Sequence, residues 1–494
     1  MPCMNWFSMF FMSRQMRSER EWICSSLDMK RGGGNPVNLI EEKDGLVSKS
    51  KKIITIYIVF LFAVVWFSYY NQFVFGANRV AGGVVSVGIH FIIYNYFAKL
   101  YRAYKIGTYK ISEIIFSQIL AIGLSDTVLY VECCLVSHHY VSILPGLVAA
   151  GIQILGMAVW AVYTKQYFIR YIEANSTLVL YGGGDAGEFV SKLKYKYEHL
   201  FQIQETVNIE ECTARELHAK IDQHDTVILY EVSKGYRTGT MEYCIEHQKN
   251  LYITPRISDI ILQGFKERTL IDTPLFKYEY HYLDTKEYRT KRMLDLTVSL
   301  FALVLTAIPM LLTAVAIKLE DHGPVFFKQD RCTVDGKVFT IIKFRSMVPD
   351  AEKQGTVIPC TNHDPRITKV GGVIRRFRID ELPQLFNIIK GDMSVVGPRP
   401  ERVEHVRKYC EEVPEFAYRM RVKGGLTGYA QIFGKYNTSA SDKLKLDLMY
   451  IENQSLLLDL KMIMLTVKTL FIAESTEGFE EEKSRLIGKW DAEG

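Results

Sequence analysis

Two adjacent carboxylates, Asp380 and Glu381, stand in the segment RRFRIDELPQLFN, directly after three arginines within four residues. Neighbouring residues of a helix diverge by about 100°, so these side chains cannot share one proton as a dyad. They suit a division of labour, in which one carboxylate attacks a phosphorus atom and the other holds a metal ion. Mg²⁺ is the natural ion for carboxylate and phosphate oxygens. The pair therefore predicts phosphate chemistry; the ordinary alternative is a solvated helix face.

Basic residues that could bind a diphosphate accompany this pair. Lys343 and Arg345 are two residues apart in GKVFTIIKFRSM, so a strand would place both on one face. Arg375 precedes the carboxylates, and GPRP fixes Arg399 between two prolines as a pre-ordered fork for phosphate oxygens. Each short motif is common alone, and a solvated edge strand would also explain the first two. The ordered set favours a phosphate site.

A long apolar segment comes before this chemistry, over residues 296–317, and carries no charge for 22 residues. A bilayer takes about 20 residues to cross, but Pro309 breaks or bends a helix, and basic residues flank both ends. We expect a re-entrant helix hairpin that dips into one leaflet. The alternative, a plain spanning helix, would put everything after Lys318 outside the cell, away from activated nucleotide substrates.

The first third of the chain is predicted to be a four-helix transmembrane domain over residues 51–170. Short linking segments and basic flanks put both ends of this unit in the cytoplasm by the positive-inside rule. Asp126 and Glu132 lie inside the third run, and we expect them to pack against other helices or to lie near the outer interface, with a pathway role as the alternative. The four apolar runs cover residues 53–73, 80–98, 114–136 and 141–163.

The remaining composition excludes several classes of protein. The net charge is only +5 and no basic tail is present, which argues against a nucleic-acid partner. The nine cysteines form no CxxC motif, so neither a zinc site nor a disulfide framework is expected. Residues 1–50 are predicted to be a disordered or interfacial leader, and residues 476–494 a solvated acidic tail.

A Rossmann-like α/β domain is predicted over residues 175–280. In YGGGDAGEF, a strand is followed by Gly182, Gly184 and Gly187 in the spacing GxGxxG, which brings backbone N–H groups up to a diphosphate. Further strands are expected at 226–232 and 250–255. The acidic residue expected after a second strand has no convincing candidate among Glu205, Glu210 and Glu211. Both a nucleotide-binding domain and a structural or regulatory fold without redox chemistry fit this pattern.

From Lys291 to about Ile472, the chain resembles the bacterial sugar transferases, the monotopic polyprenyl-phosphate sugar-1-phosphate transferases, and the catalytic domain is expected over residues 286–475. The resemblance rests on motifs that occur in order: KRMLDLTVSL, GPVFFKQDR, KFRSM, DPRIT, RIDELPQLFN, KGDMSVVGPRP, LTGYAQIFGKYN and LDLMYIENQSLLLDLKM. The whole chain is similar to the large form of that family, in which four transmembrane helices and a Rossmann-like domain precede the catalytic part. It implies an α+β membrane-associated catalytic domain with a re-entrant helix hairpin.

The resemblance also implies roles for individual residues. It makes Asp380 the nucleophile and Glu381 the Mg²⁺ ligand, and Pro309 matches the family's helix-breaking proline. The phosphate-binding residues would be Arg375 and Arg399, supported by Lys343 and Arg345. The sequence departs from the family pattern at four positions: Ile308 stands where some members have serine, Gly424 where many have proline, and Cys332 and Thr333 replace commoner residues.

The function implied is transfer of a sugar 1-phosphate, glucose or galactose, from a UDP-sugar to undecaprenyl phosphate through an aspartyl-phosphosugar. Such a step initiates exopolysaccharide, capsule or O-antigen synthesis at the cytoplasmic face of the inner membrane. A metal-dependent glycosyltransferase that releases UDP is one alternative, and a non-catalytic nucleotide-sensing membrane protein is another. The oligomeric state stays open, a homo-oligomer included. Near the C-terminus, Lys461 and Lys468 lie on a largely apolar helix that is either an interfacial anchor or packed on the catalytic domain.

Overall fold

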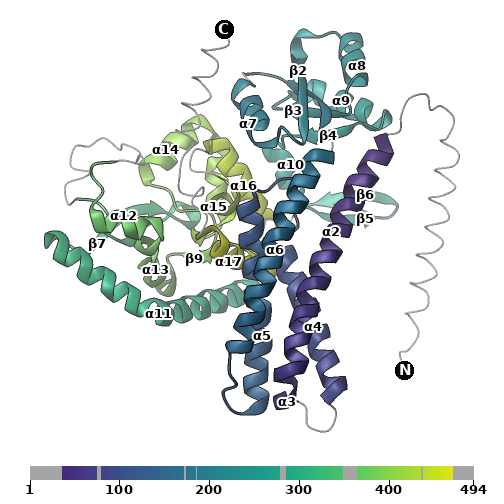
Figure 1. The fold of residues 1–494 in the computed structure, drawn as a ribbon. Coiled ribbons are helices and arrows are strands. Elements are labelled where there is room, and N and C mark those ends of the chain that lie inside the picture. Colours follow the sequence, from purple (N-terminus) through teal and green to yellow (C-terminus); the bar gives the residue numbers. More distant parts are fainter. Residues whose placement is uncertain are drawn as a thin grey trace.

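The computed structural model describes three regions in the order that the sequence predicts (Figure 1). Part of the predicted leader and all of the predicted acidic tail lie outside the described residues. A bundle of long apolar helices leads to a small α/β domain, and an α+β domain lies beside the bundle. The described residues are 36–74, 79–171, 174–184, 186–278, 285–348, 364–434 and 438–470.

The four predicted apolar runs form the four helices of the bundle. Together with one later helix, they are long and apolar enough to cross a membrane, which makes the chain a membrane protein. The first helix starts at Pro36, so the last part of the predicted leader is helical, and it continues through a π-helical turn and α3. The elements are α2 (Pro36–Val65), the π turn (Trp66–Tyr70), α3 (Asn71–Val74), α4 (Arg79–Leu100), α5 (Ile111–Ser137) and α6 (Leu144–Tyr171).

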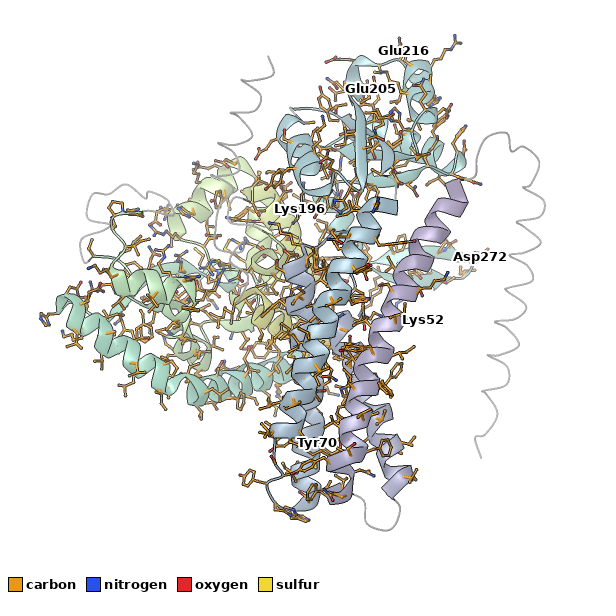
Figure 2. All side chains as sticks on the ribbon, in the orientation of Figure 1. Lys52, Tyr70, Lys196, Glu205, Glu216 and Asp272 are labelled. Atoms are coloured by element: carbon orange, nitrogen blue, oxygen red, sulfur yellow. The ribbon has the colours of Figure 1, made fainter. Side chains whose placement is uncertain are left out.

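Polar contacts fix how these helices pack against one another. His90 of α4 is fully buried, and its Nε2 lies 2.8 Å from Oδ1 of Asp126 in α5. Asp126 thus packs against another helix, one of the two expected locations. Tyr70, which Figure 2 labels at the end of the bundle away from the α/β domain, donates its hydroxyl to the Ser142 carbonyl at 3.0 Å.

The middle domain is a parallel four-stranded sheet in the order β2-β1-β3-β4. In Figure 1, α7 lies on one face of the sheet and α8 and α9 lie on the other. Buried apolar side chains of β1 and β3 form the core with residues of α8 and α9. The elements are β1 (Asn175–Tyr181), α7 (Gly187–Tyr197), β2 (Phe201–Asn208), α8 (Ala214–Asp222), β3 (Thr226–Tyr230), α9 (Lys234–Glu246), β4 (Asn250–Ile253) and α10 (Ile257–Leu262).

A β-hairpin follows the middle domain and stands away from it. Its antiparallel strands β5 (Lys266–Leu270) and β6 (Thr273–Lys277) are exposed along their whole length. Asp272 lies in the turn between them, where Figure 2 labels it.

The apolar segment around Pro309 forms one helix, α11 (Thr285–Asp321), which continues through the proline. The expected hairpin, two helices joined by a turn, is therefore not present, and a single helix forms in its place. Figure 1 shows that α11 runs across the direction of the four N-terminal helices and curves under α12 and α13. α11 is therefore not parallel to the helices of the bundle. Large apolar side chains along α11, among them Val304, Ile308 and Leu312, are exposed.

The α+β region packs against the upper side of α11. Its core includes Leu385, Met393, Phe416, Leu444 and Met462, all nearly inaccessible to solvent. Its larger sheet is the antiparallel pair of β7 and β8, and its smaller sheet is the parallel pair of β9 and β10. The elements are β7 (Phe326–Cys332), β8 (Val338–Phe344), α12 (Lys369–Arg376), α13 (Gln384–Lys390), β9 (Ser394–Val396), α14 (Val403–Glu412), β10 (Gly425–Thr427), α15 (Tyr429–Phe433), α16 (Ala440–Glu452) and α17 (Leu456–Leu470).

The last described helix, α17, is packed inside the molecule. Asp459, Met462, Leu465 and Lys468 on one face of α17 are buried. The Lys468 ammonium donates to the Tyr101 carbonyl at 3.1 Å, in the segment between α4 and α5. Of the two alternatives that the sequence left open for this helix, packing is the one that the structure displays.

Candidate active site

The acid pair lies in a short connection between two helices. After α12 ends, Arg378 adopts the left-handed conformation with φ of 54°, and the 3₁₀ turn Ile379–Glu381 follows before α13 begins. The side chains of Ile379 and Leu382 pack on the cluster formed by Met310 of α11, Phe344 and Ile374. The turn that carries the carboxylates therefore shares an apolar cluster with the apolar helix.

The Glu381 carboxylate is the centre of an ion-pair network. It is 9% exposed, and its Oε1 accepts from Nη2 of Arg399 at 2.6 Å and from Nζ of Lys343 at 3.2 Å. Nη1 of Arg378 lies 3.9 Å from Oε2. Burial works to raise the pKa of Glu381, but the charges of Arg399 and Lys343 outweigh it and hold the pKa well below its usual range. Glu381 is thus kept ionised.

Asp380 has a different environment although it is the next residue. Burial and then the charge of Glu381 raise the pKa of Asp380 to about 6, while Lys343, Arg375 and Arg399 oppose this rise. Among the residues that the structure describes, no side chain forms an ion pair or hydrogen bond with its carboxylate within the distances that define Glu381's network. An ionised but unpaired carboxylate is the state that a nucleophile requires.

The predicted basic residues divide into two groups. Lys343, Arg375 and Arg399 act on the acid pair, Lys343 and Arg399 through ion pairs with Glu381 and Arg375 through its field at Asp380. Arg345 follows the last residue of β8, and its side chain does not join the network around the acid pair. Its guanidinium pairs with Asp321 at the end of α11 and donates from Nε to the Pro324 carbonyl at 2.6 Å. The structure therefore brings three of the four together.

Two arginines that the sequence did not single out adjoin the site. Arg331 of β7 donates from Nη1 to the Pro400 carbonyl at 3.2 Å, and burial first, then the charge of Arg399, lowers its pKa to about 10. Arg419 donates from Nη2 to the Arg399 carbonyl at 2.9 Å. Arg331 could have been found, because it closes the motif GPVFFKQDR at strand spacing from Gln329. Arg419 stands among ordinary helix residues and carried no such signal.

The start of α11 is attached to the catalytic core by three charged residues of the KRMLD motif. Nζ of Lys291 lies 2.6 Å from Oδ2 of Asp459, and Arg292 donates to the carbonyls of Ile388 and Ile389, each at 2.6 Å. Asp295 of the same turn of helix is buried and accepts from Ser394 Oγ at 2.9 Å. These contacts set the position of the apolar helix relative to the acid pair.

Two of the departures from the family pattern contact each other. The backbone N–H of Gly424 donates to Thr333 Oγ1 at 3.1 Å, and Thr333 donates in turn to the Asp392 carbonyl at 3.1 Å. A proline at position 424 would have no N–H to donate. Thr333 and Gly424 are thus hydrogen-bonded to each other, and neither bonds the carboxylates.

The carboxylates suit a magnesium ion that shares its ligands with a phosphate substrate. Within the described ranges, no group of three or more acidic, histidine or cysteine side chains is arranged to hold a metal by itself. Mg²⁺ is commonly bound by one or two carboxylates together with substrate phosphates and water. Glu381 is ionised, as a ligand must be, and its Oε2 is less engaged than its Oε1. The donor set fits that kind of site.

The glycine motif of the middle domain lies at the carboxyl end of β1, as predicted. Gly183 takes the left-handed conformation (φ 73°), and Gly187 is the first residue of α7. A Cβ at Gly182 would lie 3.4 Å from Cα of Val232, just after β3, which is an ordinary van der Waals distance. Gly184 has open space around it. The described glycines therefore lie in the turn and at the helix start, as their spacing predicts.

The acidic residue that the sequence could not place is found after β2. Glu210 follows this strand, and its Oε1 would lie 3.6 Å from a Cβ at Gly182. Glu205 lies within β2 and pairs with Lys220. The strand escaped notice because its residues alternate between exposed and half-buried, as at a sheet edge, and give no apolar run.

Comparison with known proteins covers chiefly the α+β region. The family model described as bacterial sugar transferase matches residues 286–473. An uncharacterized sugar transferase, EpsL, of Bacillus subtilis (strain 168) is 42% identical over 187 residues, which are 38% of this chain and 90% of that protein. Nearly the whole of a small relative therefore corresponds to the region that holds Asp380 and Glu381.

Larger relatives match over part of their length. A UDP-N-acetylgalactosamine-undecaprenyl-phosphate N-acetylgalactosaminephosphotransferase of Aeromonas hydrophila is 44% identical over 183 residues, 36% of this chain and 43% of that protein. An undecaprenyl-phosphate glucose phosphotransferase of Komagataeibacter xylinus is 31% identical over 312 residues, 60% of this chain and 59% of that protein. The matches span about half the length of these two relatives. With the family model and the small relative in agreement over the catalytic region, the chain belongs to the bacterial sugar transferase family.

Proposed function

We propose that this protein transfers a sugar 1-phosphate from a UDP-sugar to undecaprenyl phosphate and so initiates the synthesis of a surface polysaccharide. The observation that carries the proposal is the contrast within the acid pair. Glu381 is neutralised by Lys343 and Arg399, whereas Asp380 is ionised near neutral pH and has no partner among the described residues. The names of the larger relatives supply the substrate class.

In the first step, a carboxylate oxygen of Asp380 attacks the phosphorus that carries the sugar. The bond from that phosphorus to the bridging oxygen breaks, and UMP leaves with the electron pair. Arg399 and Arg375 offset the negative charge that develops on the phosphate oxygens. In the second step, a phosphate oxygen of undecaprenyl phosphate attacks the same phosphorus, which frees the carboxylate and gives a lipid diphosphate sugar.

A bound Mg²⁺, with Glu381 as its protein ligand, would supply charge neutralisation to the diphosphate. The chain's own residues provide the rest of the site. Lys343 and Arg399 keep Glu381 ionised. Burial lowers the pKa of Lys343 itself, and the charge of Glu381 opposes this lowering.

A lipid acceptor would explain why the carboxylates lie near an apolar helix. The turn Ile379–Glu381 packs in the same apolar cluster as Met310 of α11, and large apolar side chains along the middle of α11 are exposed. We infer that α11 lies in the cytoplasmic leaflet, where a polyprenyl phosphate presents its headgroup, and that Pro309 permits its curvature. The catalytic domain then faces the cytoplasm, where UDP-sugars are found.

The names of the relatives narrow the transferred sugar to a few candidates. Their names give glucose and N-acetylgalactosamine, and galactose was also expected from the sequence. Membranes that contain the protein, incubated with each UDP-sugar in turn, will identify the donor by the nucleotide released.

The decisive measurement is the identity of that nucleotide together with the fate of Asp380. The proposal expects UMP, a phosphosugar that can be trapped on the wild-type protein, and loss of turnover in Asp380→Asn. Release of UDP would instead support the metal-dependent glycosyltransferase. Full activity of Asp380→Asn would remove the covalent mechanism. A protein that releases no nucleotide with any donor would support the nucleotide-sensing alternative.

A further inference from the structure

The backbone around Arg399 is held from three directions. Pro398 and Pro400 have no N–H group, so this segment cannot be fixed by the usual strand pairing of its own donors. Its carbonyls are used instead. The Pro398 carbonyl accepts from Gly425 N at 2.8 Å, the Arg399 carbonyl from Arg419 at 2.9 Å, and the Pro400 carbonyl from Arg331 at 3.2 Å.

Of these three donors, Arg419 contacts the residue that itself reaches the acid pair. The Arg399 side chain extends to Glu381, and the Arg399 carbonyl is bonded to the Arg419 guanidinium. Any movement of Arg419 is therefore transmitted to the backbone from which Arg399 reaches the site.

Arg419 is itself fixed by buried partners. Its side chain is 5% exposed, and Oδ2 of Asp447, on α16, lies 3.0 Å from Nε and 2.7 Å from Nη2. Nη1 lies 3.7 Å from Oε1 of Glu401, and the guanidinium stacks 4.8 Å from the ring centroid of Phe416. Arg419 therefore has an acidic partner on two sides and an aromatic ring near its guanidinium.

A buried ion pair is weak support for stability, because removing two charges from water offsets much of their attraction. What such a pair does well is to fix geometry. The planar guanidinium bonds Asp447 through Nε and Nη2 and the Arg399 carbonyl through Nη2. The ammonium of lysine carries three donors but has no planar fork, so it does not keep these angles. The arrangement suits alignment more than general stabilisation.

We propose that Arg419, oriented by Asp447, is a positioning residue that sets the backbone of Arg399 and thereby the alignment of its guanidinium with the reacting diphosphate. This inference rests on the proposed function, because it takes Arg399 to bind the phosphates of the donor. Arg419 itself is not proposed to contact the substrate or Asp380.

The test compares two neighbouring arginines of the same 3₁₀ segment, Pro414–Arg421. Arg419→Lys keeps the charge and removes the fork. Arg421→Lys is the matched control, because Arg421 also has a buried acidic partner, Glu452, but points to Tyr278, with Nη1 2.6 Å from its hydroxyl. A displacement of about 1 Å in a positioned group can lower a rate by about 100-fold. We expect kcat with the UDP-sugar to fall by about 10- to 100-fold in Arg419→Lys and to change little in Arg421→Lys.

A double-mutant cycle with Arg399→Lys separates positioning from a merely structural role. If Arg419 acts through Arg399, Arg419→Lys will cause little further loss of kcat once Arg399 is already lysine. If it only stabilises the fold, the two losses will multiply, as they will for Arg421→Lys with Arg399→Lys. Multiplying losses, or a wild-type kcat in Arg419→Lys, would overturn the inference.

Two further measurements keep the outcome clear. If Arg419→Lys does not yield folded protein, Asp447→Asn enters the same cycle, since it removes the charge that holds the fork. The nucleotide released by the wild type is identified in the same assay. UDP in place of UMP would refute the proposed function, while the cycle on kcat would still decide whether Arg419 acts through Arg399.

Discussion

Neutralising one carboxylate of the acid pair should stabilise the catalytic domain, whereas neutralising the other should destabilise it. The two variants, Asp380→Asn and Glu381→Gln, are nearly isosteric with the wild type and lie side by side in one turn. They differ in what surrounds the charge that is removed. The opposite signs follow from the electrostatics of the site and not from any difference in packing.

For Asp380, the charge is unfavourable in the folded state. Its pKa rises from 3.8 to about 6, a difference of about two pH units, and each unit corresponds to about 1.4 kcal/mol. The carboxylate is not fully buried, so solvent screening reduces the figure to about 2 kcal/mol. Because the folded pKa is raised, this penalty is fully present above pH 6 and disappears as the pH falls toward 3.8. Asp380→Asn should remove it.

For Glu381, the charge is favourable because two cations depend on it. Glu381→Gln would leave Lys343 and Arg399 without their carboxylate. Breaking a buried pair by removing one partner destabilises a protein by about 3 kcal/mol or more. In a domain of this size, about 3 °C accompanies each kcal/mol. We therefore expect an unfolding temperature about 6 °C higher for Asp380→Asn and about 9 °C lower for Glu381→Gln at pH 7.5.

The measurement is made on the full-length protein in detergent with EDTA, so that no divalent ion contributes. Opening of the catalytic domain is followed by alkylation of Cys332, whose thiol is buried, with the modified peptide quantified by mass spectrometry. Glu412→Gln, which removes an exposed carboxylate that pairs with Lys408 on the surface, serves as the control and should leave the transition unchanged. If both site variants shift the transition in the same direction at pH 7.5, the assignment of charge states to Asp380 and Glu381 is wrong.

Three other outcomes are expected. Arg399→Lys should lower kcat/KM for the UDP-sugar by about 100-fold. Arg345→Lys disturbs the ion pair with Asp321 and should lower the unfolding temperature while leaving kcat/KM unchanged; equal effects of the two substitutions on kcat/KM would contradict the division of the basic residues into two groups. Since only ionised Asp380 can attack, kcat/KM should fall as the pH drops through about 6, and a profile flat to pH 5 would count against Asp380. Burial lowers the pKa of Lys468 from 10.5 to about 8, so wild-type stability should rise between pH 8 and 10.5; Lys468→Met should lack that rise in the same unfolding series.

The fold class and the acid pair could be predicted from the sequence because both leave local signals in it. Apolar runs of bilayer length and the spacing of the three glycines predicted the helical and α/β regions, and the helices and sheet confirm them. β2 was missed for a physical reason. An edge strand with one face in solvent has no apolar run, so Glu210 could not be recognised as the residue that follows it.

Arg345 illustrates where spacing misleads. Side chains two residues apart share a face only while the strand continues, and β8 ends at Phe344. Arg345 therefore turns to Asp321 at the end of α11, whereas Lys343 remains with Glu381. No periodicity in the sequence shows that β8 ends before Arg345. Nor does it show that this end lies next to α11, a helix that begins 60 residues earlier.

The roles of Arg419 and Lys468 depend on contacts between segments far apart in the chain. Lys468 is bonded to the Tyr101 carbonyl, 367 residues away, and Arg102 stacks 4.5 Å from the ring centroid of Phe433. The same segment between α4 and α5 receives Lys165 of α6, whose Nζ lies 2.8 Å from the Ile106 carbonyl. Every residue has a backbone carbonyl, so the sequence alone does not show which carbonyl a side chain will bond. Because this segment is bonded to both α6 and α17, the helical bundle is a direct support of the catalytic domain and not merely its membrane anchor.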